Sequence, residues 1–527
     1  MGYFSRSSAI LSIFSFLVFS ASLGISSSAR DDFVQCLSLQ QPSIPVPIYT
    51  PNTTNYTTLF RSSARNLRYL SNTSLTPEVI ITPTHESHVQ AAVICCKKHG
   101  LDLKVRSGGH DVEGLSYASD KPFVIVDLVD YRNVTVDLKD NTAWVQAGAS
   151  LGEVYYRIGE KSKTLGFPAG FCPTVGVGGH ISGGGFGALV RKYGLASDQV
   201  IDAYIVTVDG KILNKETMGE DLFWAIRGGG ASSFGVILSW KIKLVPVPPI
   251  VTVATVDRTL EQGATSLVHK WQYIADKLDA DLYMAPTFTV VNSSRQGEKT
   301  VQAQFSFLFL GGVDKLLQIM EANFPELGLK RNDTMEMSLV ESHVYFYRRG
   351  SPLELLLDRD PIMKSFLKVK SDYVKEPISE AGLEEIWKRY IEGDAPAMLF
   401  TPFGGRMNEI SEFALPYPHR AGNIYNIMYV SNWLQESESE KQLDWLRKFY
   451  SFMGQYVSKF PRSAYLNYKD LDLGVNNNQD GISGYLNAKI WGTKYFKLNF
   501  ERLVLVKTTV DPENFFKNKQ SIPSITS

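Results

Sequence analysis

The chain has 527 residues, of which 44% are hydrophobic and 20% charged, a composition typical of ordinary globular proteins. Lysine and arginine together number 54, as do aspartate and glutamate, so the formal net charge is zero. This balance gives no reason to expect binding to nucleic acid or to an anionic membrane surface. The length exceeds what one hydrophobic core usually supports, so we expect two or more domains.

Residues 1–29 have the pattern of a secretory signal peptide. Arg6 supplies a positive charge, residues 9–23 form a short apolar run, and small residues follow at 26–29. The run is too short for a stable transmembrane helix, and no later stretch is apolar for long enough to span a bilayer. We therefore expect a secreted protein. Six N-x-S/T sequons agree with that route: Asn52, Asn55, Asn72, Asn133, Asn292 and Asn332.

The chain contains four cysteines, Cys36, Cys95, Cys96 and Cys172. In an oxidising compartment Cys36 could pair with Cys95 or with Cys96. These two are adjacent in a predicted helix and project in different directions, so we expect only one of them to be bridged. Cys172 is then left unpaired, either as a buried inert thiol or as a residue with a covalent role.

The predicted elements begin after a polar N-terminal arm at 30–76, which we expect to wrap over the core. A first domain at 77–250 follows. Its first predicted elements are strands at 77–83 and 103–105, a helix from Thr84 to about Gly100, strands at 123–128 and 143–147, and a helix at 151–161 capped by Ser150.

Two glycine-rich loops in this domain each carry one nucleophilic side chain. The first is the segment 105–110, which ends at His110, and the second is the segment 170–187, which contains Cys172. Glycine lets a backbone take positive φ and approach a ligand closely, and the amides of such turns can bind a pyrophosphate. A single loop of this kind is weak evidence, but two that each carry a nucleophile form a specific constellation.

The rest of the first domain contains a predicted strand at 200–208, the hairpin turn Asp209-Gly210, a glycine-rich turn at 221–230 and a strand at 235–244. The proline cluster at 245–249 marks the predicted domain boundary.

A second α+β domain is predicted at 251–455, with a sheet broad enough to cover a ligand. Its predicted strands lie at 300–310 and 425–430, and its helices at 314–323, 383–391 and 441–456. In the final segment, 456–527, tyrosines cluster around an asparagine at 464–472. This pattern favours a buried aromatic strand first and a functional site second. His85 and His88 share a helix face without nearby acidic or cysteine partners, so we expect no metal site.

Together these motifs resemble those of the plant berberine bridge enzyme-like flavoproteins, over nearly the whole mature chain. The segments that carry the resemblance are 106–111, 172–176, 182–185, 224–230, 465–472 and 511–516. The last third is similar to the cannabinoid synthase branch of that family.

The resemblance implies an α+β fold with a vanillyl-alcohol-oxidase/PCMH-type FAD-binding domain at 77–250, a substrate domain with a broad antiparallel sheet at 251–455, and a C-terminal segment that returns to the FAD domain. It implies FAD attached covalently at two points, His110 to the 8α-methyl and Cys172 to C6, and a disulfide between Cys36 and Cys95. Imidazole and thiolate are both able to add to an electron-poor ring. The other residues expected around FAD are Arg106, Ser107, Gly108, Gly109, Val175, Gly176, Gly179, His180, Gly183, Gly184, Gly185, Val236 and Asn467.

The chain departs from the family pattern at the expected proton acceptor. Val112, Phe186 and Met428 stand where many relatives have tyrosine, tyrosine and a glutamate or glutamine. Three apolar replacements in one site favour a hydrophobic substrate over a sugar. The remaining candidate base is Tyr468, with Tyr465 second, although a phenol of ordinary pKa is a poor base at neutral pH.

The resemblance therefore implies a secreted or vacuolar oxidase that passes a hydride from a phenolic, prenylated or alkaloid substrate to FAD. Val175, the small residue three positions after Cys172, favours O₂ as the acceptor, with H₂O₂ as product. The alternatives are a redox-neutral pericyclase, a carbohydrate oxidase, and a non-enzymatic storage or allergen-like protein with a vestigial flavin. We expect no nucleic acid partner, no membrane association and a monomer.

Overall fold

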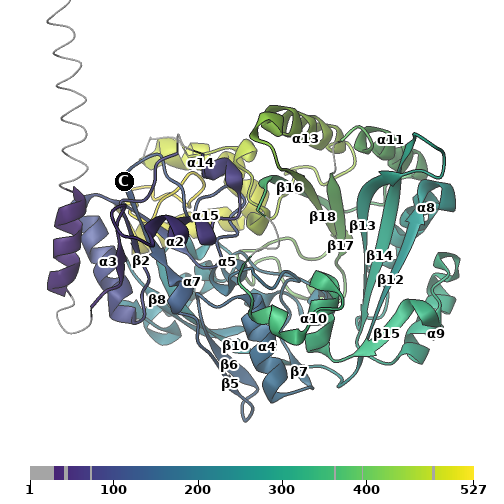
Figure 1. The fold of residues 1–527 in the computed structure, drawn as a ribbon, viewed down its shortest axis with the longest axis horizontal. Helices are drawn as coiled ribbons and strands as arrows, with labels where there is room; N and C mark the ends of the chain where they lie inside the picture. The colour runs from purple at the N-terminus through teal and green to yellow at the C-terminus, as the bar shows by residue number, and fades with distance from the viewer. Residues whose placement is uncertain are drawn as a thin grey trace, which may run out of the picture.

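The computed structural model describes residues 29–40, 45–71, 74–360, 364–393, 396–476 and 481–526. The described chain is α+β. A four-stranded, a five-stranded and a two-stranded sheet (β7 with β11) lie in the part of the chain that contains the glycine-rich loops, and a seven-stranded sheet forms the other part (Figure 1). The predicted signal peptide lies outside the described residues apart from Ala29.

The first sheet has the order β1-β2-β4-β3, in which β2 and β3 both pair in parallel with β4. Its strands are β1 Ile48–Tyr49, β2 Val79–Ile81, β3 Asp102–Arg106 and β4 Phe123–Asp127. Helix α3, Glu86–His99, starts two residues later than predicted because the side chain of His85, rather than that of Thr84, accepts the Ser87 N–H. It ends as predicted, with Gly100 in the left-handed conformation at φ 67°.

The second sheet is antiparallel, in the order β5-β6-β10-β8-β9. Its strands are β5 Val134–Asp137, β6 Thr142–Gln146, β8 Val200–Val206, β9 Ile212–Leu213 and β10 Val236–Lys243. The predicted Asp209-Gly210 hairpin joins β8 to β9. The prediction of a turn over all of 221–230 was wrong, because α7, Lys215–Ile226, occupies its first part. Asn214 and Thr217 cap that helix reciprocally, and the backbone leaves it at Arg227.

Helix α4, Leu151–Lys161, has the bounds and the cap that the sequence predicts. Ser150 Oγ accepts the Glu153 N–H, and Glu153 in turn accepts the Ser150 N–H at 2.8 Å. The other short elements of this half are α2 Tyr56–Ser62, α5 Val177–Ser182, α6 Val190–Tyr193, β7 Leu165–Gly166 and β11 Val245–Pro246.

The seven-stranded antiparallel sheet has the order β15-β12-β14-β13-β17-β18-β16. Its strands are β12 Val251–Thr259, β13 Leu282–Asn292, β14 Lys299–Phe309, β15 Thr334–Met337, β16 Phe366–Val374, β17 Ala397–Pro402 and β18 Tyr425–Trp433. The helices of this region are α8 Ala264–Ile274, α9 Val313–Asn323, α10 Leu339–Arg348, α11 Glu380–Tyr390, α12 Arg406–Glu409 and α13 Ser439–Met453.

Residues of opposite character alternate along β14 and give the sheet two different faces. Phe305 and Phe307 are buried in the hydrophobic core, where α8 and α11 contribute Trp271 and Trp387. Gln304 and Ser306, one position away, line a cavity on the other face. Because side chains alternate sides along a strand, one segment supplies both the core and a wall of the cavity.

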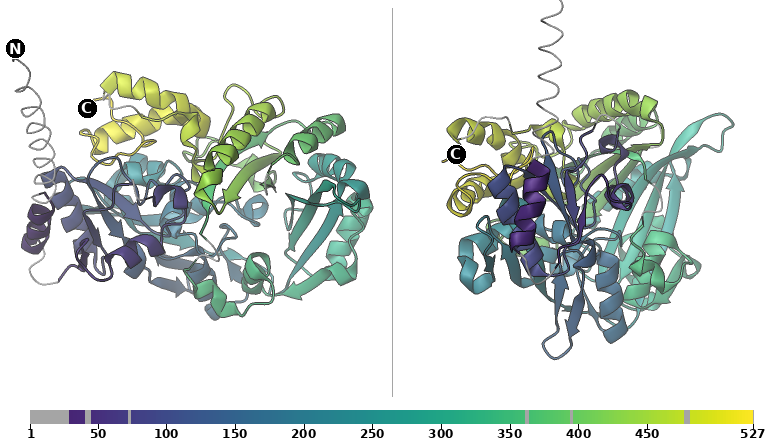
Figure 2. Two further views of the ribbon diagram at one scale, coloured as in Figure 1. Left: turned by 45° about the horizontal axis from the view of Figure 1, so that its top comes forward. Right: turned by 60° about the vertical axis from the view of Figure 1, so that its left-hand side comes forward.

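The C-terminal segment does not contain the predicted aromatic strand. Residues 464–472 instead form two 3-10 turns, Leu466–Tyr468 and Leu471–Leu473, because local bonds close them, including the Asp472 N–H to the Asp470 side chain. Helices α14 Gly481–Phe496 and α15 Asn499–Val510 then lie against the first domain, away from the wide sheet (Figures 1 and 2). Arg502 of α15 pairs there with Asp221 of α7 at 2.6 Å.

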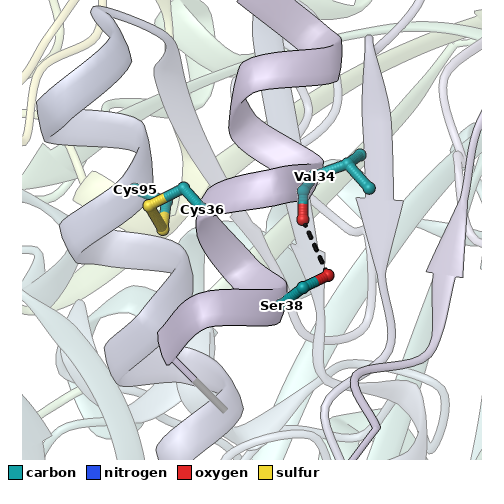
Figure 3. Close-up of a disulfide and its surroundings, with 4 residues drawn as sticks. All are labelled: Val34, Cys36, Ser38 and Cys95. Atoms are coloured by element: carbon teal, nitrogen blue, oxygen red, sulfur yellow. Dashed lines mark hydrogen bonds between the residues drawn. A yellow bond between two sulfur atoms is a disulfide. The ribbon is translucent and has the colours of Figure 1, made fainter. Parts of the chain in front are cut away.

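The N-terminal arm is tied to this body by a disulfide. Residues 29–40 are helical, and Cys36 in them is bonded to Cys95 of α3, which confirms the expected pair (Figure 3). Cys96 is a buried free thiol and Cys172 is free and half-buried.

The predicted glycosylation sites Asn52, Asn55, Asn133, Asn292 and Asn332 are exposed, and Asn72 lies outside the described residues. Among the helices that the structure describes, none combines the length and apolarity needed to cross a bilayer. The described residues also contain no cluster of three or more metal-ligating side chains.

Candidate active site

The two glycine-rich loops lie backbone against backbone at one end of a large cavity. A Cβ atom on Gly108 would lie 2.3 Å from the backbone nitrogen of Gly176. Gly109 has φ 67°, and a Cβ there would lie 1.6 Å from the carbonyl oxygen of Ser63 in the N-terminal arm. These close backbone contacts leave no room for a Cβ atom, so both positions require glycine. The packing of the two loops also brings His110 and Cys172 together.

His110 and Cys172 face the same cavity and share one hydrogen-bonding partner. The Nε2 atom of His110 lies 2.9 Å from the hydroxyl of Thr174, and the Cys172 sulfur lies 3.5 Å from the same hydroxyl. A turn from Cys172 to Val175, closed at 3.3 Å between backbone atoms, sets this geometry. Burial, reinforced by the nearby Arg65 cation, lowers the pKa of His110 to about 3, so its imidazole is neutral.

The cavity has a volume of about 630 Å³ and an unpaired row of donors along the first loop. Within the described part of the chain, the backbone N–H groups of Gly108, Gly109 and His110 find no acceptor. At Gly179, on α5, an added Cβ would meet no protein atom within 4 Å although the residue lines the cavity. Open space beside unpaired amides is what a bound dinucleotide's pyrophosphate needs, so the residues fit FAD.

Most of the residues predicted around FAD line this cavity, and four do not. The lining ones are Ser107, Gly108, Gly109, His110, Cys172, Val175, Gly176, Gly179, His180, Gly183 and Asn467. The two candidate bases, Tyr465 and Tyr468, line the cavity as well. Arg106 instead is buried against Asp127 at 2.6 Å and binds carbonyls of the arm, so it supports the loop from behind. Gly184 and Gly185 have positive φ and pack against protein side chains, and Val236 is buried between two lining neighbours.

His180, expected around FAD, also makes a structural contact. Its Nε2 accepts the backbone N–H of Gly170 at 3.1 Å, which fixes the start of the Cys172 loop against α5. Burial lowers the pKa of His180 to about 4, so the ring is neutral and able to accept.

The two candidate tyrosines differ in their hydrogen bonding. The Tyr465 oxygen receives the Gly185 N–H at 2.9 Å and the Asn467 side-chain amide at 2.8 Å. Tyr468 lines the cavity, and within the described residues its hydroxyl makes no hydrogen bond. Burial raises the pKa of both phenols, so both are neutral at physiological pH. Tyr468 is the one whose hydroxyl is available to a ligand.

Val112, Phe186 and Met428 all line the cavity, so the three apolar departures noted in the sequence meet in one site. Phe186 stacks on Tyr465 with ring centroids 4.5 Å apart. Among the described residues that line the cavity, the carboxylate and imidazole groups are Asp111, His110 and His180. Asp111 Oδ1 accepts the Glu113 and Leu115 N–H groups, and His180 Nε2 accepts the Gly170 N–H, so these atoms are already engaged by the backbone.

The seven-stranded sheet provides the opposite wall, in line with the predicted sheet broad enough to cover a ligand, but the sequence did not identify the side chains that it presents. Its polar side chains are Thr287, Gln304, Ser306 and Thr401, with Tyr283 beside them. Thr287 faces Gln304 directly across β13 and β14. Gln304 donates to Asp257 at 3.1 Å, which holds its amide in place. The alternation of polar and aromatic residues along 302–309 was the available signal.

Two families match the chain at its two ends. A family described as "FAD binding domain" matches residues 77–215, and one described as "Berberine and berberine like" matches residues 464–523. The first range contains both tethering candidates, and the second contains both candidate tyrosines.

Similar proteins cover nearly the whole chain. A protein of Argemone mexicana named tetrahydroberberine oxidase is 73% identical over 99% of this chain and 97% of its own length. A protein of the same name from Berberis wilsoniae is 53% identical over 99% of both. The crystal structure of berberine bridge enzyme from Eschscholzia californica is 38% identical, covers 94% of this chain and 100% of that one, and superposes with a TM-score of 0.89.

Proposed function

Because the chain belongs to the berberine bridge enzyme-like family of FAD-dependent oxidoreductases, we propose that it oxidises a tetrahydroberberine-type alkaloid at the carbon next to its ring nitrogen. Such an alkaloid is a flat, largely apolar tertiary amine with ether oxygens on its aromatic rings. The fold confirms the predicted α+β class with a PCMH-type FAD domain.

We propose that His110 and Cys172 hold the isoalloxazine covalently, with the unpaired amides of residues 108–110 binding the pyrophosphate. The shared contact with Thr174 supports this, since two nucleophiles on one hydroxyl can reach neighbouring positions of one ring. Thr174 engages Nε2 of His110 and leaves Nδ1 available. Bound FAD would accept a hydride from the substrate and pass two electrons to O₂, giving H₂O₂.

The observation that carries the choice of substrate is the apolar wall of Val112, Phe186 and Met428. The one carboxylate among the described lining residues is Asp111, whose Oδ1 already accepts two backbone N–H groups. Oxidation of an alcohol requires removal of its O–H proton, and general-base catalysis of such a step contributes about 10²–10⁴-fold. In a tertiary amine the nitrogen lone pair drives hydride departure, so no base is needed for that step. Phe186 and Met428 also favour the free amine over its ammonium form, because an apolar surrounding penalises the charge.

Tyr468 is our candidate for the proton acceptor in a later step. Full aromatisation of the ring requires a second hydride loss and the loss of a carbon-bound proton. The Tyr468 hydroxyl lies in the cavity without a partner in the described chain, whereas Tyr465 is held by two donors. A neutral phenol suits a slow, assisted proton transfer better than a rapid alcohol deprotonation.

We also propose an oxidase rather than a dehydrogenase. Val175 lines the cavity three residues after Cys172, and its small side chain leaves O₂ access to the ring. Two relatives carry the word oxidase in their names, which agrees with this choice.

The test is substrate oxidation by the purified protein. Under anaerobic conditions, tetrahydroberberine is expected to bleach the flavin absorbance, and a phenylpropanoid alcohol and glucose are expected to leave it unchanged. In air, H₂O₂ is expected at twice the amount of alkaloid consumed if the ring becomes fully aromatic. Bleaching by glucose alone would support the carbohydrate alternative, and alkaloid conversion without O₂ uptake would support a redox-neutral cyclase.

We propose delivery through the secretory pathway to the apoplast or a vacuole, with glycans on the exposed sequons. The disulfide between Cys36 and Cys95 agrees with an oxidising compartment. Intact-mass measurement before and after glycosidase treatment tests glycan occupancy. Size-exclusion chromatography with light scattering tests the expected monomer.

A further inference from the structure

Three aromatic side chains meet at the part of the cavity next to Cys172. Phe171 directly precedes Cys172, Tyr283 comes from β13 and Phe346 from α10, and all three line the cavity. The Phe171 ring centroid lies 5.5 Å from that of Tyr283 and 5.4 Å from that of Phe346. We call these three residues the aromatic cluster.

The rings of the aromatic cluster are inclined to one another and do not stack flat. The interplanar angles are 48° between Phe171 and Tyr283 and 74° between Phe171 and Phe346. Tyr283 is buried, whereas both phenylalanines are half-buried. Burial raises the pKa of the Tyr283 phenol, so this ring carries no charge at neutral pH. Because the rings are inclined, their π faces point in different directions, as in the aromatic cages that bind quaternary ammonium groups.

The oxidation proposed above creates a positive charge in this cavity. Loss of a hydride from the carbon next to the nitrogen leaves an iminium cation, and full aromatisation leaves a quaternary aromatic nitrogen. An oxidised flavin ring is neutral, so it offers no charge to balance this cation. Among the described lining residues the charged side chains are Asp111 and Lys469, and Asp111 Oδ1 is already engaged by backbone N–H groups. An unbalanced cation in an apolar site is costly, so it needs another partner.

We propose that the aromatic cluster binds the cationic nitrogen of the oxidised alkaloid by cation–π contact and so selects substrates whose oxidation produces a cation. A cation is attracted to the electron-rich face of an aromatic ring, and the attraction grows when water is excluded. The same contact stabilises the partial positive charge of the hydride-transfer transition state, which is how it favours such substrates. If Cys172 is joined to flavin C6, the aromatic cluster begins one residue from a ring position beside N5, where the hydride is received. This inference rests on the proposed function and names the groups that recognise its charged product.

The experiment measures the binding of two probes to the purified, oxidised flavoprotein by equilibrium dialysis. One probe is the quaternary protoberberine cation, and the other is its 8-oxo lactam, which has the same ring skeleton and no charge. The unmodified protein is compared with Phe346→Leu, Phe346→Tyr and Phe171→Leu. Phe186→Leu is the matched control, because Phe186 lines the cavity but stacks on Tyr465 instead.

Phe346→Leu keeps an apolar side chain and removes the π face. It is expected to bind the cation about tenfold more weakly than the unmodified protein does, and to bind the lactam within about twofold. Phe171→Leu is expected to have the same selective effect. Phe346→Tyr keeps the ring and is expected to retain its affinity for the cation within about twofold. Phe186→Leu is expected to change both affinities by the same factor.

Equal changes in the affinity for cation and lactam in Phe346→Leu would overturn the inference, as would a loss in Phe346→Tyr as large as that in Phe346→Leu. Phe346 lies on α10 and not in the Cys172 loop, so its variants decide the matter if Phe171→Leu loses flavin or does not fold. Anaerobic bleaching of the unmodified protein by tetrahydroberberine tests the proposed function separately. Failure to bleach would refute that function, whereas bleaching together with equal probe responses would refute the role of the aromatic cluster alone.

Discussion

The two walls of the cavity are built in different ways. The cofactor wall consists of backbone, with glycines in direct contact and amides left unpaired, so its shape depends on contiguous residues. The substrate wall consists of single side chains from four strands, such as Thr287 and Gln304, which the sheet register brings together. The cofactor wall therefore tolerates little change, whereas the substrate wall can change one side chain at a time without altering the fold.

The largest expected effect comes from Gly109→Ala, which breaks the cofactor wall. The added Cβ would lie 1.6 Å from the Ser63 carbonyl oxygen, and φ is 67°, so the loop and the arm must separate. We expect a protein without bound flavin or no soluble protein. The matched control is Gly219→Ala, where φ is 74° but an added Cβ meets no atom within 4 Å. That variant is expected to lose only about 1 kcal/mol and keep its flavin absorbance. Full flavin content in Gly109→Ala would contradict the backbone-packing argument.

The next largest effect is a loss of stability when Lys368 is removed from the buried ion cluster between the two walls. Lys368 of β16 is buried and pairs with Glu113, three residues after His110, and with Asp470 at 2.6 Å, two residues after Tyr468. Lys368→Met removes the cation that Glu113 and Asp470 share, although Arg68 and Lys370 still lie beside them. We therefore expect a loss of about 3 kcal/mol in the free energy of unfolding, the lower end for a broken buried ion pair. Denaturant unfolding measures it. The exposed Lys388→Met serves as control and is expected to leave the free energy of unfolding nearly unchanged. A small effect in both would show that the walls are joined by other contacts.

The difference between the walls also explains what could be predicted from the sequence. Helix α4 with its Ser150 cap and the strands around the glycine loops follow from local patterns. The meeting of His110 with Cys172 was instead implied by the family resemblance. Gln304 was missed because its role depends on the register of β14 against β13, which no local pattern fixes. The aromatic cluster was missed for a similar reason, because its rings come from separate parts of the chain and meet only in the folded structure.

The prediction of an aromatic strand at 464–472 was wrong because side-chain hydrogen bonds to the nearby backbone favour turns over a strand there. Tyrosine-rich segments favour strands, but Asp470 accepts the Asp472 N–H and so closes a turn. The turn directs Tyr465 toward Gly185 and leaves Tyr468 on the cavity.

Changing the substrate wall is expected to alter affinity without loss of flavin. Gln304→Leu removes an amide donor that can bind an ether oxygen of the alkaloid, so we expect KM to rise about tenfold with kcat nearly constant. Gln302→Leu is the matched control, since Gln302 lies one step along the same face of β14 and does not line the cavity. Steady-state kinetics on alkaloids with and without ring ethers measures the difference. Equal changes in both variants would show that the amide has no contact with substrate.

Lowering the pH is expected to have a smaller effect on stability, through Asp472 in the ion cluster around Lys368. Burial by itself raises the pKa of Asp472. The hydrogen bond from Arg447 and the positive charges of Lys368 and Lys370 outweigh burial and lower this pKa overall. A carboxylate with a depressed folded-state pKa stabilises the fold above its unfolded pKa of about 3.9 and loses that contribution as pH falls further. Asp472→Asn should therefore lower the thermal midpoint at pH 6, and the difference from the unmodified protein should begin to shrink only as the pH falls below about 3.9. Asp444→Asn, at an exposed pair, is the control.

The smallest expected effect is that of Tyr468→Phe, which distinguishes amine from alcohol chemistry in the cavity. In Tyr468→Phe, flavin reduction by tetrahydroberberine should slow by less than about threefold, because the nitrogen lone pair replaces the base. Stopped-flow bleaching under anaerobic conditions isolates this step from proton transfer and from reoxidation. A later loss of the carbon-bound proton should slow more, so the partly oxidised alkaloid should accumulate before the aromatic product. Tyr465→Phe is the comparison, and it loses the acceptor for Gly185 and Asn467 and should weaken the fold instead. A drop of 10²-fold or more in the first step would identify Tyr468 as a base for hydride transfer and would remove the main argument for an amine substrate.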